Sequence, residues 1–190
     1  MPTQTILTTR RLHMRQWRRV DLQPYARHCN TPDVMEWLGG VMTPRQVVLD
    51  FEYFQRQQRR NGFTFWVLER KSDRAFMGFC GLVRVTERSS TVLGQVEIGW
   101  RLRSDMWRRG YAFEAATRVL QFAFTDLDLP IVVSRVAAGN EPSQALMCKL
   151  YMRRVSELDY VHPADRTPLL VYSIERREWL GAYARDQCDR

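Results

Sequence analysis

Residues 96–116 read VEIGWRLRSDMWRRGYAFEAA, and no other part of the chain says as much about the expected fold. The first residues complete a stretch over 92–102 that we interpret as a strand. A loop follows that carries four arginines: Arg101, Arg103, Arg108 and Arg109. Small and apolar residues then recur at helical spacing over 110–127, with Gly110 at the start. The stretch therefore predicts a strand, a basic loop and a helix in direct succession.

The start of the predicted helix is a candidate anion site. Free backbone N–H groups and the positive end of the helix dipole meet there. The dipole contributes about 0.3–1 kcal/mol at an exposed site, and each hydrogen bond to a charged group adds about 1.5–3 kcal/mol. The loop thus reads either as a pyrophosphate cradle or as a solvated arginine-rich turn, and charge alone does not choose between them. The chain has no GxxxxGK[ST] motif and no GxGxxG after a strand, which excludes two common phosphate loops.

Outward from this stretch, strands and helices alternate. Upstream we expect a strand over 11–17, a helix that Asp21 caps and that runs to about Cys29, and a short helix after Pro32. A further helix is capped by Thr43, with Pro44 in its first turn. Strands over 63–69 and 76–85 form an antiparallel meander with 92–102. Downstream we expect a buried strand over 131–137, a helix over 140–150, closing strands over 155–158 and 169–174, and a helix over 176–183. The order predicts a mixed α/β (α+β) fold in a single domain, 1–190.

Length and composition agree with one globular domain. The chain has 190 residues, of which 45% are apolar and 26% charged, so disorder is not expected. No apolar run approaches the roughly 18 residues of a membrane span, and the N-terminus has no signal-like apolar core. We therefore expect a cytoplasmic protein that has no membrane partner.

Cysteine and histidine positions do not suggest a metal. The four cysteines lack CxxC spacing, and the three histidines are scattered, so no metal is expected. Cys80 and Cys148 lie in apolar stretches and are expected to be small core residues.

The charge balance is strongly basic. There are 29 lysines and arginines against 21 acidic residues, a net charge of +8. A positive net charge favours a polyanionic partner. Nucleic acid, the ribosome, an acidic lipid and a phosphate-rich cofactor all fit, and net charge alone does not choose among them.

Five motifs, in order along the chain, resemble one family. The strand 96–100 (VEIGW) together with the loop 107–112 (WRRGYA) forms one motif, which is similar to the acetyl-CoA site of GNAT N-acetyltransferases. Four further segments match family motifs: Thr8 to Trp17, Asp33 to Leu38, Phe79-Cys80-Gly81, and Asn140-Glu141-Pro142-Ser143. The chain resembles most narrowly the ribosomal-protein-alanine acetyltransferase branch (RimJ/RimL-like).

The resemblance implies a GNAT fold that binds acetyl-CoA (coenzyme A) as cosubstrate. A twisted, mostly antiparallel sheet flanked by helices would splay open between two parallel strands, 92–102 and 131–137. The pantetheine arm would bind the freed strand edge at Ile98, Trp100 and Leu102. Asn140 and Ser143 would face the other side of the cofactor.

The same resemblance assigns the pyrophosphate to the basic loop. Its N–H donors would be those of Arg108, Arg109, Gly110, Tyr111 and Ala112. Arg103 and Arg108 would be charge partners.

Two positions depart from the family pattern. The family usually has glycine where Arg108 stands, so the phosphate turn has to accept a side chain. The family usually ends the helix over 140–150 in Leu-Gly-Phe, whereas this chain has Leu150-Tyr151-Met152. A bulky group then stands where a helix end is normally small.

Acetyl transfer to an amine needs a base for the amine, a polarised carbonyl and an acid for the leaving thiolate. Glu97 is the candidate base; the alternative is that it is exposed or pairs with an arginine. His162 is the competing base, or a solvated loop residue. Ser143 is the candidate group beside the thiolate, or a first-turn cap, since Met147 stands where many relatives have a tyrosine. A backbone N–H near Ile98 or Gly99 would donate a hydrogen bond to the oxyanion.

The acceptor stays open at this point. A protein N-terminus, a polyamine, an amino acid derivative and an antibiotic amine all fit, and a homodimer is the assembly considered. Five aromatic residues can line an acceptor pocket, although core packing is the simpler explanation: Trp37, Tyr53, Phe54, Phe63 and Trp66. The alternative functions are a nucleic-acid- or ribosome-binding module, which the motifs do not favour, and a CoA-binding protein without turnover.

Overall fold

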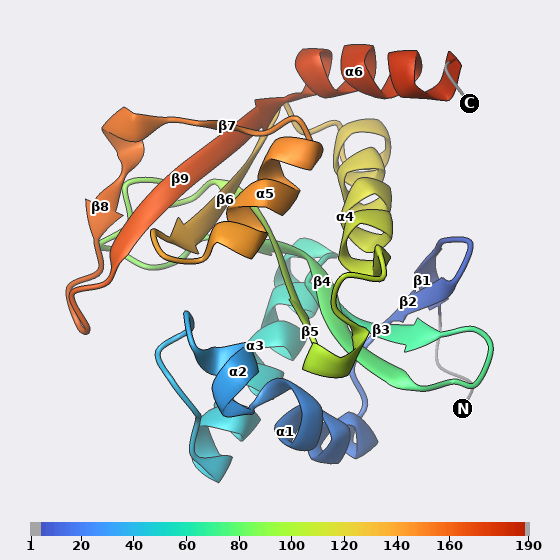
Figure 1. Ribbon diagram of the computed structural model, residues 1–190, viewed down its shortest axis with the longest axis vertical. Helices are drawn as coiled ribbons and strands as arrows, with labels where there is room; N and C mark the ends of the chain where they lie inside the picture. Colours follow the sequence, from blue (N-terminus) through green and yellow to red (C-terminus); the bar gives the residue numbers. More distant parts are fainter. Residues whose placement is uncertain (1–4, 189–190) are drawn as a thin grey trace. The chain divides into compact units, whose positions relative to one another are not determined.

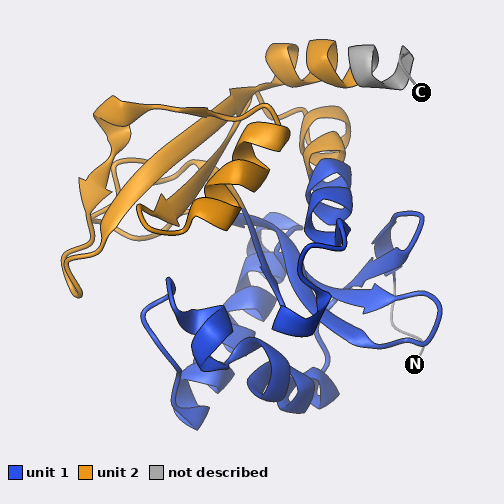
Figure 2. Cartoon of the chain, viewed as in Figure 1, with its two compact units in different colours: residues 1–83, 99–119 blue, residues 84–98, 120–190 orange. Residues whose placement is uncertain are grey.

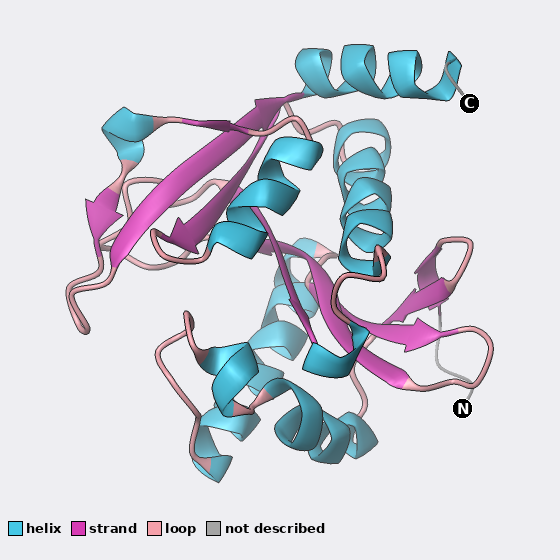
Figure 3. Cartoon of the chain, viewed as in Figure 1, coloured by secondary structure: helices cyan, strands magenta, loops and turns pink. Residues whose placement is uncertain are grey.

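The computed structural model describes residues 5–188, with side chains described to residue 183. In chain order the strands and helices are β1 (Thr5–Thr8), β2 (Leu12–Arg15), α1 (Leu22–Cys29), α2 (Pro32–Met35), α3 (Pro44–Asn61), β3 (Phe65–Arg70), β4 (Phe76–Arg84), β5 (Val96–Leu102), α4 (Tyr111–Gln121), β6 (Ile131–Ala137), α5 (Glu141–Lys149), β7 (Arg153–Arg154), β8 (Tyr160–Val161), β9 (Pro168–Glu175) and α6 (Arg176–Cys188). Figure 1 labels them, and Figure 3 separates helix, strand and loop by colour.

The strands form one sheet in the order β1-β2-β3-β4-β5-β6-β9-β7, and β8 pairs with β9. The pairs β1–β2, β2–β3, β3–β4 and β6–β9 are antiparallel, whereas β5 and β6 run parallel. The expected mixed α/β fold, with a mostly antiparallel sheet and one parallel pair, is therefore confirmed.

The chain separates into two compact units (Figure 2). The first unit contains residues up to 83 together with 99–119, and the second contains 84–98 together with 120 onward. The boundary crosses β5 after Ile98 and α4 after Val119.

The core of the first unit is aromatic. Trp17 stacks on Phe54 with ring centroids 5.2 Å apart, and Phe65 stacks on Phe79 at 5.4 Å. Of the five aromatics considered for an acceptor pocket, Phe54, Phe63 and Trp66 are buried and Trp37 is exposed. Core packing is therefore the main role of the three buried rings.

Local sequence signals account for α3. Thr43 and Gln46 form a reciprocal capping box, Pro44 occupies the first turn, and Gly62 ends the helix with a φ of 77°. Val47 and Phe51 face the core, but Val48, which shares their spacing, is 42% exposed.

Asp21 does not cap α1 as predicted. Its carboxylate instead accepts hydrogen bonds from Arg15 Nη1 and Nη2, both at 2.8 Å. A buried guanidinium competes successfully with the helix N–H groups because an ion pair is the stronger interaction.

The second unit is built around a long antiparallel pair. Seven residue pairs join β6 to β9, from Ile131↔Glu175 to Ala137↔Leu169. Val133 and Val171 pack there with Val85 and Val92.

Several sequence-based boundaries were wrong. Strand β5 begins at Val96, because Thr91–Gly94 form a turn. Residues Ser156–Leu158 form a 3₁₀ turn and not a strand, and β1 was not foreseen. Cys80 is buried as expected, but Cys148 is exposed on α5.

Candidate active site

The loop between β5 and α4 has the backbone of an anion cradle. After a 3₁₀ turn, Ser104–Met106, the chain adopts positive φ at Arg108 (58°) and at Gly110 (76°). Helix α4 begins at Tyr111, and Glu114 N–H donates to Gly110 O at 3.0 Å. The N–H groups that precede Glu114 in the first turn have no acceptor along the helix, which is the arrangement that binds anions.

Arg108 takes the left-handed backbone conformation that glycine adopts without strain. The departure from the family pattern is thus accommodated by placing an exposed arginine at a φ of 58°. Such a conformation costs a non-glycine residue roughly 1–2 kcal/mol.

The arginines of this loop differ in exposure and in whether a carboxylate balances their charge. Arg103, predicted to be a phosphate partner, donates to both carboxylate oxygens of Asp105 at 2.6 and 2.9 Å and to Phe76 O at 3.2 Å. Arg108 and Arg109 are exposed. The charge of Arg103 is therefore balanced within the loop, and Arg108 and Arg109 are the better candidates for holding an anion.

The sequence analysis missed a support for this loop. Glu114, in the first turns of α4, accepts from Thr9 Oγ1 at 2.5 Å, and its two oxygens accept from Arg11 N at 2.8 Å and Arg11 Nε at 2.6 Å. The turn between β1 and β2 therefore holds the beginning of α4. Nothing in the local spacing indicated it, because these residues lie more than 100 positions apart.

In the second unit, β5 and β6 separate as the resemblance implied. Within these two described strands the backbone register contains a single pair, Glu97↔Val133. Side chains replace the next ladder bonds: Ser134 Oγ donates to Ile98 O at 2.9 Å, and Arg135 N–H donates to Glu97 Oε1 at 3.1 Å. The strands are therefore held at the point where the regular pairing ends.

Glu97 is ion-paired, which is the alternative that the sequence left open. Arg135 Nε donates to Oε1 at 3.1 Å and Arg135 Nη2 donates to Oε2 at 2.8 Å. Oε1 thus accepts two hydrogen bonds and Oε2 accepts one. Oε2 therefore retains acceptor capacity for one more hydrogen, in a residue that is 8% exposed.

Arg135 also connects Glu97 to the competing base. Its Nη1 donates to Glu87 Oε2 at 2.7 Å and to Tyr160 OH at 2.9 Å, and Glu87 Oε1 lies 3.4 Å from His162 Nε2. Glu97 and His162 are thus two ends of one polar network, so substitutions at one end will affect the other.

The network shifts the ionisation of its members. Burial disfavours the charged form of Arg135, but the charge and hydrogen bonds of Glu97 outweigh it and raise the pKa of the guanidinium. Burial likewise opposes ionisation of Glu87, but hydrogen bonds from Ser89 and Arg135 outweigh it and lower the pKa of that carboxyl. Both groups are charged at neutral pH.

The start of α5 has a different cap from the one considered. Asn140 Oδ1 accepts from Ser143 N–H at 3.2 Å, so Asn140 caps the helix. The half-buried Ser143 hydroxyl is not the capping group. At the other end of α5, Tyr151 has a φ of 63°, so a tyrosine fills the position that favours glycine.

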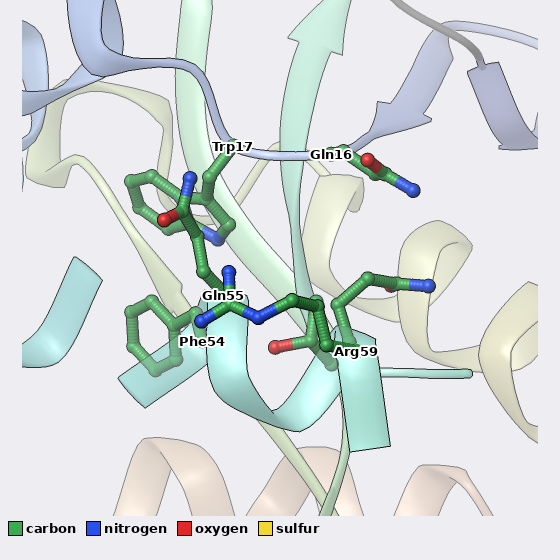
Figure 4. Close-up of a pocket in the computed structure, with 7 residues that line it drawn as sticks. Gln16, Trp17, Phe54, Gln55 and Arg59 are labelled. Atoms are coloured by element: carbon green, nitrogen blue, oxygen red, sulfur yellow. The ribbon is translucent and has the colours of Figure 1, made fainter. Parts of the chain in front are cut away.

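A small pocket of about 100 Å³ lies in the first unit between β2 and α3 (Figure 4). Gln16 and Trp17 line it from the segment after β2, and Phe54, Gln55 and Arg59 line it from α3. It includes none of the residues predicted for catalysis or cofactor binding, and Phe54 is its one member among the aromatics considered for an acceptor pocket.

The described residues contain no group of three or more metal-ligating side chains. None of their helices is long and apolar enough to cross a membrane.

Comparisons with known proteins identify the family of this chain. A family model for an acetyltransferase (GNAT) domain matches residues 11–153. An uncharacterized N-acetyltransferase of Bacillus licheniformis is 24% identical over 182 residues, which are 92% of this chain and 98% of that protein.

Solved structures share the fold at low sequence identity. An acetyltransferase from Agrobacterium tumefaciens superposes with a TM-score of 0.75 at 24% identity, over 92% of this chain and 95% of its own. Spermidine N-acetyltransferase from Vibrio cholerae, solved with CoA and spermine, superposes with a TM-score of 0.69 at 16% identity. The match covers 89% of this chain and 98% of that one. Because the family model covers well over half of the residues, this chain belongs to the GNAT acetyltransferase family.

Proposed function

We propose that this chain, as one domain over 1–190, transfers an acetyl group from acetyl-CoA to a primary amine by direct attack on the thioester. The observation that carries the proposal is the course of β5. This strand pairs with β6 at one residue, Glu97↔Val133, and its other end leads through a basic loop into the free N-terminus of α4.

The residues present fit the cofactor. The diphosphate is assigned to the N–H groups of residues 108–112, with Arg108 and Arg109 as exposed cations. Along β5, the carbonyls of Ile98 and Leu102 already accept from Ser134 Oγ and Trp107 Nε1, both at 2.9 Å. The pantetheine amide contacts are therefore assigned first to Trp100. Acetyl-CoA supplies the acyl group as an activated thioester.

The proton transfers are assigned to Glu97 and Ser143. The amine nitrogen attacks the thioester carbon, and Glu97 Oε2, directly or through water, accepts the proton that the nitrogen loses. The C–S bond then breaks, and the Ser143 hydroxyl donates to the departing sulfur and recovers a proton from solvent. Each such group typically contributes about 10²–10⁴-fold to the rate.

The acceptor is proposed by chemical class, as a primary amine on a small molecule or a protein N-terminus. Five motifs of the ribosomal-protein-alanine branch, from Thr8 to Ser143, support a protein N-terminus as the first acceptor to test. Two alternatives, a nucleic-acid-binding module and a CoA-binding protein without turnover, become outcomes of the experiment.

Calorimetric titration with acetyl-CoA tests the cofactor site. One-to-one binding at micromolar affinity that Arg108→Glu weakens supports it. Salt-sensitive binding of nucleic acid, with no heat from acetyl-CoA, contradicts it.

An amine and peptide screen that detects released thiol tests turnover. Glu97→Gln and Ser143→Ala are expected to lower kcat while leaving the acetyl-CoA Kd within about threefold, because proton transfer contributes to the rate and not to cofactor binding. Binding without turnover of any amine supports the non-catalytic alternative.

A further inference from the structure

The β1–β2 turn contacts the candidate diphosphate loop through one side chain, Arg11. Its Nη1 donates to Arg109 O at 3.0 Å, and its Nε and backbone N–H donate to Glu114 at 2.6 and 2.8 Å. One arginine therefore holds both the last part of the loop and the first turns of α4.

The guanidinium also covers the loop between these two contacts. Its central carbon lies 4.1 Å from the centre of the Tyr111 ring. A methyl group placed on Gly110 would lie 3.4 Å from Nη2. Arg11 is thus packed along the backbone from Arg109 to Tyr111, where the anion is proposed to bind.

Glu114 places a negative charge close to the proposed anion site. Burial opposes its ionisation, but hydrogen bonds from Thr9 and Arg11 outweigh this and lower the pKa of its carboxyl, so Glu114 is negative at neutral pH. A carboxylate in the first turns of α4 repels a diphosphate at the helix start. The Arg11 guanidinium, 2.6 Å away, cancels that charge.

We propose that Arg11 is a positioning residue of the diphosphate site, which holds the Arg109 carbonyl in place and neutralises Glu114 so that the start of α4 accepts a doubly charged anion. The inference rests on the proposed function, because the diphosphate is that of acetyl-CoA. It adds to the site a residue that lies 98 positions from the loop it supports.

The test compares two ligands that differ in the diphosphate. Dissociation constants are measured for acetyl-CoA and for acetyl-pantetheine, which lacks the phosphates. We expect Arg11→Met to weaken acetyl-CoA about 10–100-fold, the range of one charge-assisted hydrogen bond, and to leave acetyl-pantetheine within about twofold. Arg10→Met is the matched control, because it removes a neighbouring exposed arginine, and acetyl-CoA affinity is expected to stay within about twofold.

A second variant separates charge from packing. In Arg11→Met/Glu114→Gln the uncompensated carboxylate is gone, so acetyl-CoA affinity is expected to recover by about threefold or more relative to Arg11→Met. A purely structural role for Arg11 gives no recovery. If Arg11→Met does not fold, Arg11→Lys, which keeps the charge but loses the two-pronged contact, is expected to show the same ligand-selective loss in milder form.

Three results overturn the inference: unchanged acetyl-CoA affinity, equal losses for both ligands, or no recovery with Glu114→Gln. If the wild-type protein does not bind acetyl-CoA at all, the proposed function itself fails. Inorganic pyrophosphate is then the probe. Weaker pyrophosphate binding by Arg11→Met than by Arg10→Met supports the inference, and equal binding overturns it.

Discussion

Two arginine-centred charge networks, one in each unit, use the same chemistry in different surroundings. In the first unit, Arg15 donates to Asp21 and to Glu69, and all three side chains are at most 4% exposed. In the second unit, Arg135 joins Glu97 to Glu87, whose side chain is 31% exposed.

The difference in access separates a structural role from a chemical one. The carboxylates of the Arg15 network are buried, and its exposed members, Arg18 and Arg74, are both cations, so we assign this closed network to the packing of β2 against β3 and α1. The network of Arg135 reaches solvent through Glu87 and His162 and can exchange protons with it. We propose that the network of Arg135, which opens to solvent, takes part in proton transfer, whereas the network of Arg15 is structural.

The largest expected effect is at the closed network. Arg15→Met removes the buried counterion that Asp21 and Glu69 share and leaves beside them only the more exposed Arg18 and Arg74. The free energy of unfolding should therefore fall by about 3–5 kcal/mol. Urea denaturation measures it. Arg18→Met is the control, because the Arg18 side chain is 43% exposed at the edge of the same network. The free energy of unfolding of this variant should fall by less than about 1 kcal/mol. Similar losses for both variants would contradict the comparison.

The open network should affect catalysis more than stability. Arg135→Lys keeps the positive charge but cannot hold both oxygens of Glu97, so kcat should fall about 10–100-fold, equivalent to about 1.5–3 kcal/mol. Steady-state kinetics at saturating acetyl-CoA measure the loss. The KM for acetyl-CoA should change less than about threefold, and a change confined to KM would show that Arg135 acts on binding alone.

A smaller effect is expected in the pH dependence of stability. Because the pKa of Glu87 is lowered in the folded state, its contribution to stability is fully present above the ordinary glutamate pKa and is lost as the pH falls through the lowered value. Glu87→Gln should therefore be less stable than wild type at neutral pH by at most about 1 kcal/mol, since the pair is partly exposed. The two proteins should converge once the pH has fallen below the lowered pKa of Glu87, and urea titrations across pH test this. A difference that persists in acid would assign the loss to packing.

The smallest effects should be gains, at one position in each unit. Arg108 and Tyr151 both have φ near 60°, where glycine is unstrained. Arg108→Gly and Tyr151→Gly should each raise the free energy of unfolding by up to about 1 kcal/mol, because relief of strain exceeds the added entropy of the unfolded chain. Thermal unfolding measures both.

The two glycine variants should differ in their effect on the cofactor. Arg108→Gly should also weaken acetyl-CoA binding, because it removes a proposed phosphate partner, whereas Tyr151→Gly is expected to leave it unchanged. Destabilisation by either substitution would show that the side chain contributes more contacts than the strain costs.

The sequence by itself determined the elements whose signals are local. The capping box of Thr43 and Gln46, the apolar run of β6 and the glycine before α4 each lie within a few residues of the structure they specify. Backbone preferences and the period of apolar residues act over such distances, so these elements and the basic loop could be predicted. The same locality explains why the resemblance to one family was visible in short motifs.

Only the tertiary structure decided which charges meet. Glu97 and Arg135 are 38 positions apart, and Arg11 and Glu114 are 103 apart. An arginine in the sequence has many carboxylates within reach of its charge, and the topology of the sheet selects one. Aspartate is a common N-cap residue, but Asp21 pairs with Arg15 because a buried ion pair is a stronger interaction than a helix cap. Long-range pairing depends on how the strands are ordered, and strand order is a property of the whole chain.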